Sequence, residues 1–159
     1  MFENLSSVFS ALGLGYLVFT AWPLAKTDIL ERRLPNKYVL PGFPITWAGQ
    51  LLAGLIGSGF EGMLFAFVTA LLVFTVSLLI NRAGLLGMGD VKLMTLMSLA
   101  LGWYSMLLPI IAFGLTFIIA GLVAIALVIT KRIRVGGSMP LGPYLIAGFL
   151  GTLTLAVWS

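Results

Sequence analysis

The sequence predicts an all-α integral membrane protein, built as a bundle of about six transmembrane helices. Of its 159 residues, 60% are hydrophobic and 9% are charged, and the mean hydropathy is +1.14. Soluble domains carry about 25% charged residues, so this chain has too little polar surface to face water and must face lipid. In addition, its apolar residues come in runs of about 20, the length that spans a bilayer. We interpret residues 1–159 as a single membrane domain.

The first expected helix is too long for the core of a signal peptide and follows no basic segment, so we expect it to be retained. Pro41 and Pro44 lie in the first turns of the second helix or kink it. The fourth helix is short. The expected helices cover residues 5–24, 38–56, 61–80, 90–101, 106–130 and 141–158.

A break must separate the fourth and fifth expected helices. One continuous helix over residues 93–130 would extend about 57 Å, which is nearly twice the thickness of a bilayer core. Gly102 and Pro109 flank a short polar turn between the two apolar runs. We therefore predict that the chain turns back between these two residues.

The basic residues indicate how the bundle is oriented. All nine Lys and Arg residues fall in three polar stretches, 26–37, 81–92 and 131–139. With six helices these stretches share one side of the membrane. The positive-inside rule makes that side cytoplasmic and puts both termini on the outer side. The same asymmetry explains the net charge of +4 without a nucleic-acid partner.

The composition limits the chemistry that the chain can perform. It contains no Cys and no His, which excludes disulfides, Ser-His and Cys-His nucleophiles, and metal sites made of thiolate or imidazole ligands. Any reaction must use Asp, Glu, Lys, Arg, Tyr, Ser or Thr. We predict no metal site and no cofactor.

The only two aspartates are the candidate catalytic groups. Asp28 follows the first expected helix and Asp90 opens the fourth, so both belong to the cytoplasmic edge. Two carboxyl groups that meet in a partly dry site share a proton, because the pKa of one is raised. One can then activate a water while the other polarises a carbonyl. Position alone also fits plainer roles, a solvated loop residue at 28 and a helix N-cap at 90.

The surroundings of the aspartates favour the catalytic interpretation. Asp90 ends the run Gly87-Met88-Gly89-Asp90, in which two glycines let the backbone pass close to a substrate. Asp28 precedes a basic stretch that leads to Leu34-Pro35-Asn36, and a third segment reads Met139-Pro140-Leu141-Gly142-Pro143-Tyr144. In this order, the three motifs resemble those of the type IV prepilin peptidase family, membrane aspartic proteases of the glycine-x-glycine-aspartate class.

The resemblance implies a multi-pass enzyme of the cytoplasmic (inner) membrane whose active site faces the cytoplasm. It implies Asp28 and Asp90 as the catalytic pair. The implied substrates are pilin-like precursors, type IV or Flp-type, which lose a short basic leader beside a hydrophobic stem. Larger members carry a Cys-rich domain linked with methylation. Since this chain has no Cys, it resembles the short, peptidase-only members, and methyltransferase activity is not expected.

Five other residues are candidates for binding the substrate or shaping the site. The two glycines would set the backbone shape. The lysine could steady an ionised aspartate or serve only as a positive-inside residue, and the glutamate could contact a basic leader or face solvent. These candidates are Gly87, Gly89, Lys92, Glu31 and Pro35.

Two other functions stay open at this point. A catalytically inactive scaffold of a pilus or secretion assembly would keep the helices and need neither aspartate. A small transporter needs polar groups near the membrane midplane, where Gln50 is the nearest candidate. Beyond a precursor protein and membrane lipid the sequence indicates no partner, and it leaves the oligomeric state open.

Overall fold

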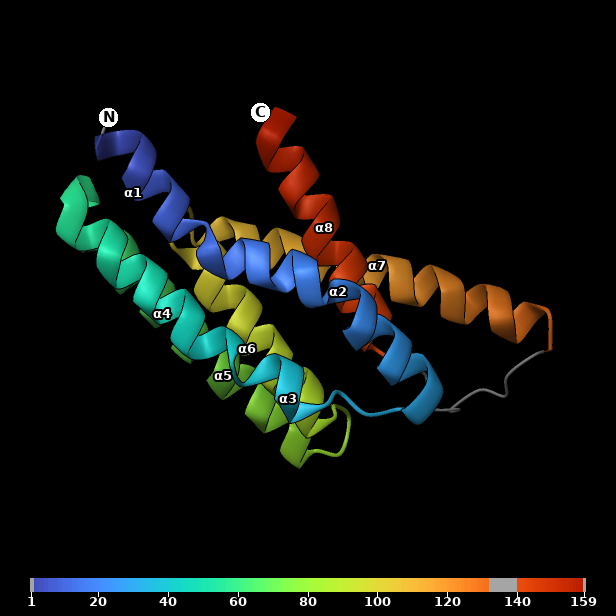
Figure 1. The fold of residues 1–159 in the computed structure, drawn as a ribbon. Coiled ribbons are helices and arrows are strands. Elements are labelled where there is room, and N and C mark those ends of the chain that lie inside the picture. Colours follow the sequence, from blue (N-terminus) through green and yellow to red (C-terminus); the bar gives the residue numbers. More distant parts are fainter. Residues whose placement is uncertain (1, 132–139, 159) are drawn as a thin grey trace.

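The structure is a computed structural model that describes residues 2–131 and 140–158. This part of the chain is helical and contains no strand (Figure 1). The elements are α1 (Phe2–Ser10), α2 (Leu12–Glu31), α3 (Asn36–Val39), α4 (Gly42–Ala53), the π-helical turn η1 (Gly54–Ser58), α5 (Glu61–Arg82), α6 (Met88–Gly102), α7 (Leu107–Ile129) and α8 (Gly142–Trp158).

The prediction of an all-helical, multi-pass membrane protein is confirmed. Four helical segments are long and apolar enough to cross a membrane, namely Leu5–Glu31, Asn36–Gly57, Glu61–Arg82 and Leu107–Ile129. The apolar helix Gly142–Ala156 is shorter, and α6 has 15 residues. The first segment takes in both α1 and α2.

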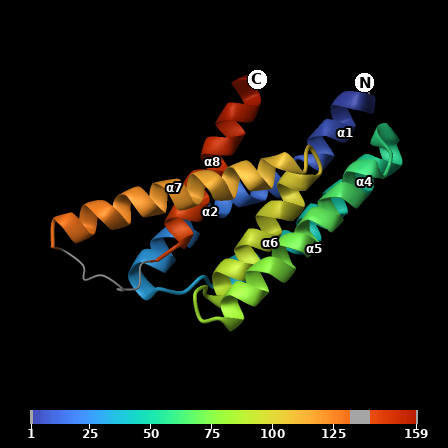
Figure 2. The ribbon, with the colours of Figure 1, turned by 180° about the vertical axis from the view of Figure 1, so that it is seen from behind.

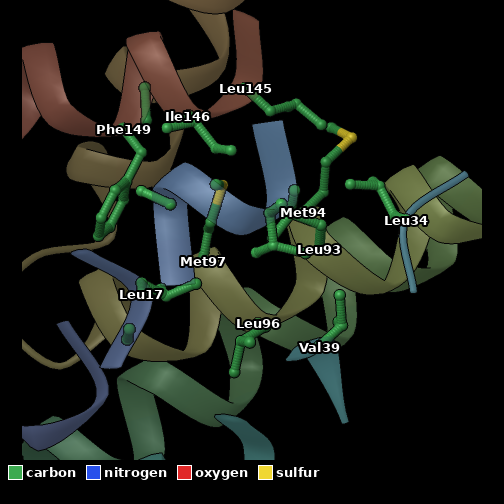
Figure 3. Packing of buried hydrophobic residues seen from close by; sticks show 14 of the residues in the cluster. Leu17, Leu34, Val39, Leu93, Met94, Leu96, Met97, Leu145, Ile146 and Phe149 are labelled. Carbon is green, nitrogen blue, oxygen red and sulfur yellow. The ribbon is translucent and has the colours of Figure 1, made fainter. Parts of the chain in front are cut away.

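The short helix α6 forms the centre of the bundle. Every residue from Leu96 to Gly102 is buried. Its side chains pack against Leu17 of α2, Val39 of α3, and Leu145 and Phe149 of α8 (Figure 3). A helix that is apolar all round is typical of such an interior position. Other helices of the protein, and not lipid, therefore cover the apolar side chains of α6.

The remaining helices surround α6 in groups. α5 packs along α6, α8 packs along α7 and reaches α2, and α4 contacts α1 and α2. Figure 2 shows α7 leaving the turn after α6 at a wide angle, so that its far end lies apart from α5. The start of α1 and the end of α8 lie at one end of the bundle, opposite the connection between α5 and α6 (Figure 1).

The first helix ends later than predicted, which corrects the expected position of Asp28. We expected helix over residues 5–24 and a polar loop from 26 to 37, but α2 continues to Glu31 and includes Asp28. Residues 25–31 contain no Gly or Pro that would stop a helix. The helix ends where Arg32 adopts a left-handed φ of 51° and donates its N–H to the Asp28 carbonyl oxygen, shortly before Pro35.

Two other predictions concerned the positions at which the helices are interrupted. The second predicted helix is divided at Pro41, which separates α3 from α4 and agrees with the alternative of a kink. The predicted turn between Gly102 and Pro109 is confirmed, because α6 ends at Gly102 and α7 begins at Leu107. In the third polar stretch, residues 132–139 lie outside the described part of the chain; they include Arg132, Arg134 and Met139.

The close contact of α7 with α8 can be tested at Gly148. A Cβ atom there would overlap the Ala112 carbonyl oxygen and the Thr116 hydroxyl group. Because backbone cannot move aside cheaply, we expect Gly148→Ala to cost about 1–3 kcal/mol of stability. The measurement is the thermal midpoint in detergent. Gly121→Ala is the control, since a Cβ there meets no atom within 4 Å, and equal midpoints for the two variants would contradict the close contact.

Candidate active site

Asp28 is buried in the last turn of α2, with 5% of its surface exposed. Its Oδ2 accepts a hydrogen bond of 2.8 Å from the backbone N–H of Gly142. Gly142 is the first residue of α8, and the first N–H groups of a helix have no acceptor within the helix. The Asp28 carboxylate therefore lies at the positive end of the α8 dipole, which stabilises its ionised form.

Asp90 lies in the first turn of α6, and the interpretation as an N-cap is wrong. The N-cap is Gly87, with an extended backbone, and Asp90 is the third residue of the helix. Its carboxylate accepts a hydrogen bond from the Gly87 backbone N–H, as the acidic residue of a capping box does. A Cβ on Gly87 would lie 2.8 Å from Asp90 Oδ2. The glycine thus leaves room for the carboxylate to fold back.

The surroundings raise the pKa of Asp90 to about 6. Burial is the largest cause, because it penalises the charged carboxylate. The negative charge of Asp28 adds to this effect, and the hydrogen bond from Gly87 opposes it. The two carboxyl groups therefore interact across the site, although they come from opposite ends of two different helices.

Leu34 packs between the segments that carry the two aspartates. It is 8% exposed. A Cβ on Gly89 would lie 2.9 Å from Leu34 Cβ, and a Cβ on Gly142 would lie 3.1 Å from Leu34 Cδ2. One leucine from the first motif thus contacts a glycine of each of the other two. This packing fixes the start of α6 and the start of α8 relative to the end of α2.

A cavity of about 1140 Å³ opens beside both carboxyl groups. Asp28 and Asp90 line it together with Arg32 and Gly87. The remaining lining is mostly apolar, and part of it comes from α5 and α7, with Leu72, Val73, Val76, Ile80, Phe113 and Phe117. The cavity can therefore hold an apolar group along these two helices while its carboxyl groups act on a polar one.

The structure places the five other candidate residues differently from one another. Gly87 lines the cavity, and Gly89 contacts Leu34 as described. Lys92 Nζ donates to Asn36 Oδ1 at 3.1 Å, a bond that ties the first turn of α6 to α3. Pro35 is the N-cap residue of α3, and Glu31 is exposed. Lys92, Pro35 and Glu31 are not among the residues that line the cavity.

Gly142 belongs to the third sequence motif, but the motif alone indicates no role for it. The signal was present, since a glycine just before Pro143 at the start of an apolar run is typical of a helix N-terminus with free N–H groups. What the pattern could not supply was the acceptor, because Asp28 lies 114 positions away. Arg32 also lines the cavity, although its place in a basic stretch fits both a contact with the precursor and a solvated loop.

Sequence similarity to known proteins covers most of the chain. The sequence model of the type IV leader peptidase family matches residues 14–153. Three similar proteins bear the name prepilin leader peptidase/N-methyltransferase. The protein of Pseudomonas aeruginosa is 26% identical over 148 residues, which is 87% of this chain and 49% of that protein. The protein of Pseudomonas putida is 29% identical over 150 residues (90% and 50%). The protein of Aeromonas hydrophila is 31% identical over 134 residues (79% and 43%).

The chain spans about half the length of these curated relatives. No solved structure matches it.

The interaction between the two carboxyl groups can be measured directly. We expect Asp90 to titrate with a pKa of about 6. In Asp28→Asn the pKa of Asp90 should fall, because the neighbouring charge is gone, but stay above 3.8, because burial is the larger cause. Aspartate labelled with ¹³C at the side-chain carboxyl reports this by NMR, and the variant leaves a single aspartate signal. An unchanged pKa of Asp90 in Asp28→Asn would show that the groups do not interact.

Proposed function

This chain belongs to the type IV leader peptidase family, and we propose that it is a membrane-embedded aspartic endopeptidase. Its substrates would be pilin-like precursors, of the type IV or Flp type, from which it removes the short basic leader. The observation that carries this proposal is the meeting of Asp28 and Asp90 at one cavity, where each raises the cost of ionising the other. The proposal covers peptide hydrolysis and not the methyl transfer that the relatives' names include.

The two aspartates differ in their surroundings, which suggests different roles. The hydrogen bond from Gly142 opposes the effect of burial on Asp28, and an ionised Asp28 can take a proton from water as a general base. Burial and the charge of Asp28 raise the pKa of Asp90 to about 6, which favours its protonated form compared with an exposed aspartate. A protonated Asp90 can donate to the carbonyl oxygen of the scissile bond while the activated water attacks the carbon. The C–N bond then breaks, the amine leaves with the proton that Asp28 took up, and a hydroxyl group of the intermediate returns its proton to Asp90 as the carboxyl product forms.

The charges support a position at the cytoplasmic edge of the inner membrane. The cations that the structure describes lie near the ends of α2, α5 and α7 and the starts of α3 and α6, and Asp28 and Asp90 lie at the end of α2 and the start of α6. Figure 2 shows these helix ends away from the start of α1 and the end of α8. The positive-inside rule makes this side cytoplasmic, and the start of α1 and the end of α8 would then face outward. A leader cut here would remain in the cytoplasm. We propose six membrane helices, with α6 and α8 added to the four long segments.

The position of Gln50 does not support the alternative function as a small transporter. Gln50 is fully buried, and its Nε2 donates to the Leu99 carbonyl oxygen at 2.8 Å. It thereby joins α4 to α6 and does not line the cavity beside the aspartates. A transport path through this cavity would lack the polar group at mid-membrane depth that the transporter interpretation needed. An inactive scaffold remains the alternative that the next experiment tests.

Replacing either aspartate tests the proposal. We expect Asp28→Asn and Asp90→Asn each to lower kcat at least about 100-fold, because general acid–base catalysis contributes about 10²–10⁴-fold. The assay follows cleavage, by mass spectrometry, of a precursor with a basic leader and an apolar stem in liposomes. Glu61→Gln is the matched control, since this acid is exposed and lies outside the cavity lining. A doubly substituted protein that still cuts the precursor would leave the scaffold as the better interpretation.

The role of Gly142 can be tested separately. In Gly142→Ala the new Cβ would lie 2.7 Å from Asp28 Oδ2, so the carboxylate must move away from its hydrogen-bond donor. A displacement of about 1 Å can cost 10²-fold in rate, and we expect kcat to fall at least about tenfold. The control is Gly114→Ala in α7, where a Cβ meets nothing within 4 Å. Full activity in Gly142→Ala, at unchanged thermal stability, would show that this contact does not position Asp28.

A further inference from the structure

A second, smaller crevice of about 210 Å³ lies where α4 and α5 both pack against α6. Four aromatic side chains line it, Phe43 and Trp47 from α4 and Phe67 and Phe74 from α5. The rings of Trp47 and Phe67 meet edge to face, with their centroids 5.9 Å apart. Among the described residues, no side chain lines both this crevice and the cavity beside the aspartates. The crevice is therefore a separate feature of the bundle.

The crevice opens toward lipid and suits an apolar occupant. Phe67 and Leu71, which line it, are 45% and 52% exposed, and they belong to a segment that is long and apolar enough to cross a membrane. The Thr95 hydroxyl in its wall already donates to the Val91 carbonyl oxygen at 2.7 Å. An apolar cavity of about 150 Å³ holds a molecule the size of benzene. This crevice therefore has room for a segment of a hydrocarbon chain.

A lysine lies on the same face of α6 as the crevice. Lys92 precedes Thr95 by three residues and Leu99 by seven, and both of these line the crevice. Residues with this spacing share one face of a helix, so Lys92 lies about one turn beyond the crevice. Its Nζ donates one hydrogen bond to Asn36 Oδ1. Because an ammonium group has three N–H donors, two remain for another acceptor.

An arginine lies at the same end of the crevice on the neighbouring helix. Arg82, the last residue of α5, is exposed. It follows Leu71 by eleven residues and Phe74 by eight, a spacing that again keeps the three residues on one side of the helix. It lies about 12 Å beyond Phe74 along the axis. The end of α5 and the start of α6 lie at one end of the bundle (Figure 2), so Arg82 and Lys92 both flank that end of the crevice.

We propose that this crevice binds one phospholipid with a negatively charged headgroup. One acyl chain lies between α4 and α5 against α6, and the phosphate group lies near Lys92 and Arg82. A zwitterionic phospholipid fits the apolar part equally well, but each cation near the headgroup favours the anionic lipid about fivefold. The site gives Lys92 a partner away from the aspartates, and it does not depend on the proposed peptidase function.

The fluorescence of Trp47 can report the lipid in the crevice, because brominated acyl chains quench a tryptophan that they contact. Replacing the other three tryptophans by phenylalanine, at positions 22, 103 and 158, leaves Trp47 alone. The protein is reconstituted in phosphatidylcholine vesicles that contain increasing fractions of brominated phosphatidylglycerol or brominated phosphatidylcholine. The matched control carries Trp47→Phe and Ile118→Trp, since Ile118 is exposed in the middle of α7 and outside the crevice.

We expect half-maximal quenching of Trp47 at an at least about fivefold lower fraction of brominated phosphatidylglycerol than of brominated phosphatidylcholine. The tryptophan at position 118 should be quenched equally by both lipids. An equal response of Trp47 to the two lipids, or the same preference at position 118, would overturn the inference. So would a Trp47 that neither lipid quenches while the control tryptophan is quenched, since a second copy of the chain would then cover the crevice.

Charge substitutions in the Trp47 protein locate the headgroup. We expect Arg82→Gln and Lys92→Gln each to lower the preference for phosphatidylglycerol at least about threefold. Lys131→Gln is the matched control, because it removes one cation at the far end of α7, which lies apart from α5 (Figure 2). A preference that survives in both Arg82→Gln and Lys92→Gln would overturn the inference.

Thermal midpoints show whether each variant folds. Lys92→Gln also removes the bond to Asn36, so Arg82→Gln provides the test if the lysine variant is unstable.

Discussion

A carboxylate with only 5% of its surface exposed needs hydrogen-bond donors, and the site depends on how this requirement is met for Asp28. An ionised group buried without a partner costs far more than a fold of this size can supply. The backbone N–H of Gly142 provides the partner, and it is a group that α8 would otherwise leave without an acceptor. This one hydrogen bond therefore gives the Asp28 carboxylate a donor and the Gly142 N–H an acceptor. It also fixes the end of α2 to the start of α8.

The position of Asp90 depends on the burial of α6. A helix of 15 residues extends about 22 Å, less than the hydrocarbon core of about 30 Å. Exposed to lipid, it would leave polar termini at the wrong depth. Because other helices surround it, its first turn can lie at the inner end of a cavity, where protein and not lipid determines the environment of the carboxyl group. The pKa of Asp90 follows from this partial burial and from the nearby charge of Asp28.

Much of this arrangement could be predicted from the sequence, because it depends on local signals. Apolar runs predicted the helices, and the excess length of residues 93–130 required the break that occurs between Gly102 and Leu107. The two aspartates stood out in a chain with few charges. The predicted end of the first helix was wrong. The charged residues suggested a loop, whereas residues Lys26 to Glu31 are compatible with a helix that continues beyond the apolar layer.

Contacts between distant segments could not be predicted in the same way. Nothing near Lys92 indicates that its ammonium group binds Asn36, and nothing near Asp28 indicates Gly142. Such pairs arise from the packing of whole helices, and a single sequence holds no periodic signal for them. The cavity belongs to the same class of features, since it depends on the angle at which α7 leaves α6 (Figure 2).

The packing of Leu34 against Gly89 and Gly142 has a consequence for how the chain can change over evolutionary time. Three segments share one small volume, so a larger side chain at Gly89 meets Leu34 first, and one at Gly142 meets both the Asp28 carboxylate and Leu34. Substitutions at these positions will be non-additive, as is usual for residues in direct contact. A substitution in one of the three motifs is therefore tolerated only to the extent that the residues of the other two motifs leave room for it.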